Sequence, residues 1–220
     1  DGTLEGDVEI SMTGHLARVR KGEHWGDAQD EVDKDFREDI NKRLRDAEVS
    51  DIVWDNLKNQ ALPLKVRFHV LVPGYAERVG KRLLVRPGFF EAATPGIFTA
   101  ETRRYPITFP FAWEESDQIS IQLPEGFELD QPTAPKNVGK LEGPFGTAYK
   151  IGYAPKSRTL KYSRDFTLGA NGALMFQAQS YPAIKAIFND IHVSDTHAIM
   201  IKPKATETPE AAPAQSPATP

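Results

Sequence analysis

Alternating apolar and polar residues predict several β-strands along the chain. The clearest lies at 64–72, LKVRFHVLV, where alternate residues are apolar and Lys65, Arg67 and His69 lie between them. Strict alternation over this length is typical of a strand with one buried face. The segment at 49–57 is ambiguous. Comparable patterns bounded by turn residues predict further strands at 3–13, 81–86, 106–110, 117–129, 148–154, 159–168 and 197–203.

The segment at 117–129, DQISIQLPEGFEL, predicts a β-hairpin. Its first strand places Ile119, Ile121 and Leu123 on one face, and we expect these three side chains in a core. Pro-Glu-Gly follows as the turn, with Gly126 free to adopt a positive φ. The second strand is the short run at 127–129.

Two segments have helical periodicity. The first, at 27–48, has acidic residues in its early turns and basic residues in its late turns, an order that suits the helix dipole. We expect Asp27 to cap it, and its apolar stripe to consist of Val32, Phe36, Ile40, Leu44 and Ala47. The second helix, at 181–191, has Pro182 in its first turn, where a missing N–H costs nothing.

Recurring short strands separated by turn signals are typical of a β-sandwich or barrel. We therefore expect a mainly β (α+β) fold. An N-terminal strand–helix unit occupies 1–48, and a β-sandwich with one short C-terminal helix occupies 49–204. The proline- and alanine-rich segment at 205–220 is predicted to be a disordered tail.

Composition removes several classes of function. The chain has 220 residues, no cysteine and a formal net charge of −4. Disulfides, thiolate metal sites and cysteine nucleophiles are therefore excluded, and a nucleic-acid partner is disfavoured. No stretch reaches the length of a membrane helix. The first residues, DGTLEGDVEI, lack a signal-peptide pattern and look like the interior of a longer protein or a mature segment.

Candidate chemistry is sparse. His192, Asp195 and His197 form an H-x-x-D-x-H run that suggests a metal site, yet it crosses from a helix end into a strand, where side chains need not converge. His69 is expected to face solvent. His15 and His24 have no neighbours in sequence that indicate catalysis.

Glu114, Glu115 and Asp117 suggest a glycosidase-like carboxylate pair, but adjacent positions before a strand favour a solvated acidic loop. A set of aromatic residues suggests either a sugar-binding platform or sandwich core: Phe109, Phe111, Trp113, Tyr149, Tyr153, Tyr162 and Phe166. We favour the core. No catalytic, cofactor-binding or metal-binding residue is assigned, and no cofactor is expected.

Three runs carry a family resemblance: RRYPITFPFAWEESDQISIQLPEGFEL at 103–129, YSRDF at 162–166 and YPAIKAIFNDIHVSDTHAIMIKPK at 181–204. Together they resemble the C-terminal region of a family of exported bacterial proteins. Those proteins combine an N-terminal β-rich domain of unknown function, a central transglutaminase-like domain of papain type and a C-terminal β-rich domain. The segment at 1–20 is similar to the region directly after the transglutaminase-like core, so the resemblance spans roughly 1–204.

The resemblance implies a non-catalytic accessory or interaction module of a larger extracytoplasmic, periplasmic protein. Its partner is the upstream transglutaminase-like domain, whose catalytic residues have no counterpart in this cysteine-free chain. An apolar patch within 2–20 would favour this hypothesis. The alternatives are a β-sandwich module that binds a glycan or peptide and, with less support, a carboxylate-dependent hydrolase.

The motifs also predict a structural ion pair. Arg103 or Arg104 and Arg164 lie in the family-like runs, near Glu114 and Asp165 in sequence. We expect at least one arginine–carboxylate pair to join strands.

Overall fold

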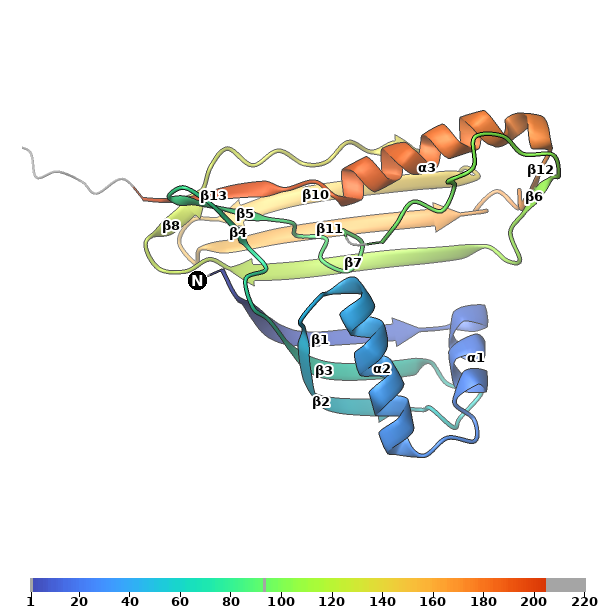
Figure 1. The fold of residues 1–220 in the computed structure, drawn as a ribbon, viewed down its shortest axis with the longest axis horizontal. Helices are drawn as coiled ribbons and strands as arrows, with labels where there is room; N and C mark the ends of the chain where they lie inside the picture. The colour runs from blue at the N-terminus through green and yellow to red at the C-terminus, as the bar shows by residue number, and fades with distance from the viewer. Residues whose placement is uncertain (1, 93, 205–220) are drawn as a thin grey trace, which may run out of the picture.

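A computed structural model describes residues 2–92 and 94–204 (Figure 1). The predicted disordered tail at 205–220 lies outside the described residues. The mainly β fold class is confirmed. In chain order the elements are β1 (Leu4–Met12), α1 (Gly14–Glu23), α2 (Gln29–Arg43), β2 (Glu48–Asp55), β3 (Leu64–Val72), β4 (Glu77–Val79), β5 (Arg82–Val85), β6 (Ile107–Thr108), β7 (Trp113–Gln122), β8 (Phe127–Leu129), β9 (Val138–Gly139), β10 (Phe145–Ala154), β11 (Thr159–Leu168), β12 (Met175–Phe176), the 3₁₀ turn η1 (Ala178–Ser180), α3 (Tyr181–Asp195) and β13 (Ile199–Pro203).

The N-terminal unit is a three-stranded antiparallel sheet in the order β1-β3-β2, with α2 packed on one face (Figure 1). All five residues of the predicted α2 stripe are buried. Because β2 and β3 belong to the same sheet as β1, the predicted domain boundary at residue 48 falls inside this sheet. The ambiguous segment at 49–57 contributes most of β2.

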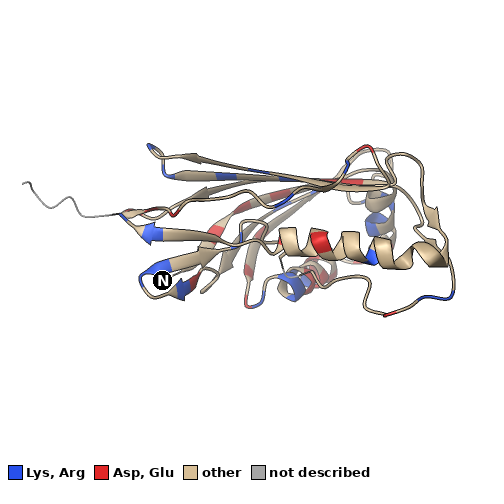
Figure 2. Cartoon of the chain, turned by 90° about the horizontal axis from the view of Figure 1, so that it is seen from above, with Lys and Arg blue, Asp and Glu red and all other residues tan. Residues whose placement is uncertain are grey.

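A larger sheet in the order β7-β11-β10-β9 forms the second unit. One end of its inner face packs against β5, β13 and β8 through a core that includes Leu160 and Ile201. The other end packs against α3 through a core that includes Phe166 and Ile184. Figure 2 shows that most of α3 carries no charge, as expected for a helix that covers a sheet. The sandwich is thus sheet on sheet at one end and helix on sheet at the other.

The predicted hairpin at 117–129 is wrong in its pairing. Both strands and the turn exist, with Gly126 at φ 77°. However, β7 pairs with β11 and β8 pairs with β13, in different sheets. Leu123 is buried, whereas Ile119 and Ile121 are half-buried and pack into two different cores. Alternation reports which face of a strand is buried and does not report its neighbour.

The N-terminal helices also differ from expectation. Asp27 makes no cap, because α2 begins at Gln29 after Ala28. The Asp27 carboxylate instead lies 3.0 Å from Nδ1 of His24, which is buried. The unassigned segment after Gly14 forms α1, and its Lys21 is buried with its ammonium donating to the carbonyls of Asn59 and Leu62, each at 2.6 Å. These bonds tie α1 to the loop before β3.

The C-terminal helix agrees with prediction and extends further. Pro182 lies in the first turn of α3, and the helix continues past the predicted end to Asp195. Within the described ranges, no helix combines the length and the hydropathy that a bilayer crossing requires.

Candidate functional site

A groove of about 960 Å³ is lined by β1 of the N-terminal unit and by β7 of the larger sheet. Figure 1 shows these two strands on the facing sides of the two units. Among residues 2–92 and 94–204, β1 pairs only with β3 and β7 only with β11, so both are edge strands of the described sheets. The units touch where Ile119 packs against the N-terminal core. They touch again where the His15 ring of α1 stacks on Phe111, with ring centroids 4.9 Å apart. The groove is therefore formed by one strand edge from each unit.

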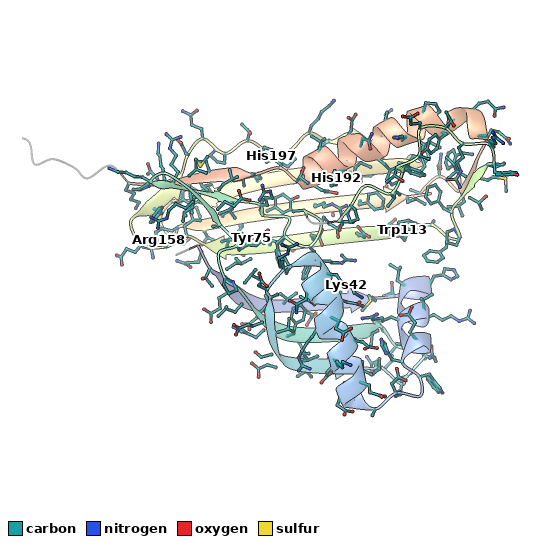
Figure 3. All side chains as sticks on the ribbon, in the orientation of Figure 1. Lys42, Tyr75, Trp113, Arg158, His192 and His197 are labelled. Atoms are coloured by element: carbon teal, nitrogen blue, oxygen red, sulfur yellow. The ribbon has the colours of Figure 1, made fainter. Side chains whose placement is uncertain are left out.

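The groove is acidic. Trp113 begins the β7 side (Figure 3), and carboxylates follow it along β7 and line β1 opposite. Only two arginines, Arg20 and Arg43, are among the lining residues. The acidic residues are Glu5, Asp7, Glu9, Asp39, Glu91, Glu114, Glu115 and Asp117.

A buried arginine lies beneath the β7 wall, on the face of the sheet between its two apolar cores. Arg164 of β11 is paired in register with Asp117 of β7 on one side and Tyr149 of β10 on the other. Its side chain is only 4% exposed. Such a charge is tolerated in an interior only when it is paired and hydrogen-bonded.

Carboxylates from two elements satisfy this guanidinium. Nε donates to Oδ1 of Asp195 at 2.7 Å, and Nη2 donates to Oδ2 of the same carboxylate at 3.2 Å. Nη1 donates to Oε2 of Glu115 at 2.9 Å and lies 3.6 Å from Asp117. The Asp195 contact is the two-bond fork that arginine geometry favours.

Asp195 reaches the cluster from the last turn of α3 and is itself buried. The Tyr149 hydroxyl donates to its Oδ1 at 2.7 Å. The loop after β5 covers the same place: a Cβ at Gly88 would lie 3.1 Å from the Tyr162 hydroxyl. Residues from α3, β10, β11 and this loop therefore enclose one polar cluster.

Burial perturbs the carboxyls that join this cluster to the groove. It raises the pKa of Glu91, with Glu115 adding repulsion, and it raises the pKa of Asp117 against the opposing attraction of Arg164. Burial disfavours the charge of Arg164, but the hydrogen bonds and attraction of Asp195 outweigh this and raise its pKa. Arg164 therefore stays positively charged. The carboxylates around it carry more negative charge than its single positive charge can neutralise.

The predicted arginine–carboxylate pair is confirmed for Arg164. Its partners are Glu115, Asp117 and Asp195, so the pairs join β7, β11 and α3. Asp165, which follows Arg164 in sequence, is not one of its partners. Its carboxylate accepts a hydrogen bond from the Ser116 hydroxyl.

The structure does not bring the H-x-x-D-x-H run together. Asp195 is held by Arg164, whereas Nε2 of His197 contacts the carbonyl of Thr133 at 2.8 Å. His192 and His197 lie near the end of α3 (Figure 3). No group of three His, Asp or Glu side chains in residues 2–92 and 94–204 is arranged to hold a metal ion.

Most of the candidate aromatic platform is core. Tyr149, Tyr162 and Phe166 are buried, Phe109 and Trp113 pack in the core beneath α3, and Tyr153 packs between the sheets. Phe111 alone among the seven candidates stacks on α1 at the groove.

His69 provides a pH-dependent contact on the N-terminal sheet. Its Nδ1 lies 2.9 Å from Asp7, and this hydrogen bond raises its pKa above the ordinary 6.5. This contact stabilises the fold at pH values below the pKa that His69 has in the unfolded chain. The stabilisation is lost as the pH rises through the higher pKa that His69 has in the folded protein.

We expect the titration of the His69 imidazole, followed by NMR, to have its midpoint above 6.5. Asp7→Asn should lower this midpoint. Asp55→Asn, which removes an Arg67 partner on the same face, should leave it unchanged; equal midpoints in wild type and Asp7→Asn would contradict the assignment.

The fold and site define a mainly β protein with a buried arginine–carboxylate cluster beneath an acidic groove. The family model described as a domain of unknown function with a solved structure (DUF3858) matches residues 81–201, and the chain belongs to this family. The match contains β7, Arg164 and Asp195 but does not include β1. No curated protein and no solved structure matches the chain.

Proposed function

We propose that the chain is a non-catalytic interaction module of a larger extracytoplasmic protein, acting beside an upstream transglutaminase-like domain. The observation that carries this proposal is the groove between β1 and β7, where two unpaired strand edges are held on packed sheets. Unpaired backbone donors and acceptors of this kind bind other polypeptides. Exposed Leu16 and Val19 on α1, within the segment where an apolar patch was expected, add further support.

The Arg164 cluster supports a structural role more than a catalytic one. Glu115 and Asp117, the two half-buried carboxylates of the hydrolase hypothesis, contact the same guanidinium. They share one strand and one cation, and they do not face each other across a cleft in the manner of glycosidase carboxylates.

Among the binding alternatives, a peptide is better supported than a glycan. A glycan site needs exposed ring faces, and Tyr149, Tyr162 and Phe166 are buried. A peptide needs a free strand edge, which both β1 and β7 provide.

The test is binding between this chain and the protein segment encoded immediately upstream, produced separately. Linkage in one chain gives a millimolar effective concentration, so a dissociation constant of about 10–100 μM is sufficient and is the expected calorimetric result. An upstream reading frame without a papain-type domain would remove the transglutaminase-like context. Absence of binding by a folded upstream segment would remove the interaction in cis.

A further inference from the structure

The two strands that border the groove are protected as edges by acidic side chains alone. Natural edges are also kept from pairing by being short or bulged, or by carrying lysine or proline. β7 pairs with β11 over ten consecutive positions without a register shift, and β1 pairs with β3 over nine. Neither strand contains proline, lysine or arginine.

Other edges of the described sheets differ in this respect. β2, at the opposite edge of the N-terminal sheet, has a register shift between Ser50 and Val53. β9, at the opposite edge of the large sheet, has only two residues. Long, regular edges whose only protection is acidic charge thus occur together at the groove, and no backbone bond joins β1 to β7 in the described parts of the chain.

The charge of these edges limits what can occupy them. Glu114, Glu115 and Asp117 lie on β7, and β1 carries Glu5, Asp7 and Glu9. A second copy of the chain pairing edge to edge would bring six or more acidic side chains together with no basic residue of β1 or β7 to offset them, which disfavours this occupant. The segment at 205–220 contains two glutamates and no lysine or arginine, so its charge does not complement the groove either.

We propose that β7 binds an extended, basic segment of a partner protein by β-sheet addition within the groove. This deepens the interaction function proposed above and rests on it. Side chains of an added strand alternate between the two faces. Basic residues on the inner face meet Glu115 and Asp117, whose side chains remain 39% and 33% exposed. Those on the outer face meet Glu114, which is exposed.

The probe is a synthetic nine-residue peptide of lysine pairs separated by single threonines, which places lysines on both faces of the added strand, and its control has glutamate in place of lysine. We expect the lysine peptide to bind and to shift the amide NMR signals of 113–122, with no binding of the glutamate peptide. Methylating alternate backbone nitrogens removes the donors that β-addition requires while keeping the charge. This methylated peptide should bind at least about tenfold more weakly.

Two matched variants locate the site. Glu114→Lys reverses an exposed charge on β7, and Glu125→Lys makes the same change in the exposed turn after β7, outside the groove lining. Because neither side chain is buried, both variants should fold. We expect Glu114→Lys to weaken the lysine peptide about tenfold and Glu125→Lys to change its affinity less than about twofold.

Four outcomes would overturn the proposal: no binding of the lysine peptide, equal binding of the methylated peptide, signal changes confined to β2, or a concentration-dependent dimer in sedimentation that Glu114→Lys abolishes. Binding of the upstream segment is measured separately. If that segment binds while the lysine peptide does not, the interaction module stands and only its basic strand ligand is wrong.

Discussion

Replacing Arg164 with methionine is expected to lower the free energy of unfolding by about 3–5 kcal/mol. Methionine keeps much of the apolar stem but removes the guanidinium that binds Asp195 through two hydrogen bonds. The Asp195 side chain is only 7% exposed, so the variant leaves a buried carboxylate without its cation. Equilibrium urea unfolding at neutral pH measures the loss.

Two further variants show whether the loss comes from the pair. Arg103→Ala removes an exposed arginine from the family-like run, and it should change stability by less than about 0.5 kcal/mol. Arg164→Met combined with Asp195→Leu removes both charges and should recover much of the loss, since replacing both members of a buried pair is often close to neutral. A loss below about 1 kcal/mol for Arg164→Met would mean that water solvates Asp195 and that the cluster is not a structural centre.

The sequence contains signals for this cluster. In β11 alternation places Arg164 on the same face as Leu160 and Phe166, both buried. On α3 Asp195 follows Ile184 and Ile191 at spacings of eleven and four, which places all three on one helix face. Each charged residue therefore occupies a position that periodicity assigns to the interior.

Periodicity does not predict that these positions meet. Arg164 and Asp195 are 31 residues apart and belong to different elements, and their contact depends on how α3 crosses the sheet. The same limit explains the pairing error at 117–129, where two correctly predicted strands enter different sheets. Local pattern determines burial and element type, whereas partner choice depends on contacts distant in sequence.

The sequence does not predict the groove, for the same reason. Glu114, Glu115 and Asp117 form an acidic run in the sequence, but the opposite wall comes from β1, more than a hundred positions earlier. An unpaired edge is a property of sheet order, and no residue pattern within β7 distinguishes an edge strand from a central one.

A close backbone approach on β10 leads to the second large prediction, in which Gly146→Ala is expected to destabilise the fold by at least about 3 kcal/mol. A Cβ at Gly146 would lie 2.6 Å from the backbone nitrogen of Leu141 and closer still to the Lys140 carbonyl group. These are main-chain atoms of the turn after β9, which no rotamer change can move. The strain must therefore displace the β9–β10 pairing itself.

Gly152→Ala is the matched control because it makes the same change on the same strand, at an exposed position where an added Cβ meets nothing within 4 Å. Alanine suits a strand interior at least as well as glycine, so this variant should lie within about 0.5 kcal/mol of wild type or be slightly more stable. Thermal and urea unfolding of the two variants measure the difference. If Gly146→Ala does not fold, its soluble yield should fall while the yield of Gly152→Ala stays at the wild-type level. That difference would also show that the added Cβ at Gly146 is not tolerated. Equal stability of the two variants would show that β9 does not approach β10 as closely as described, and that this end of the sheet tolerates a side chain where the structure leaves no room for one.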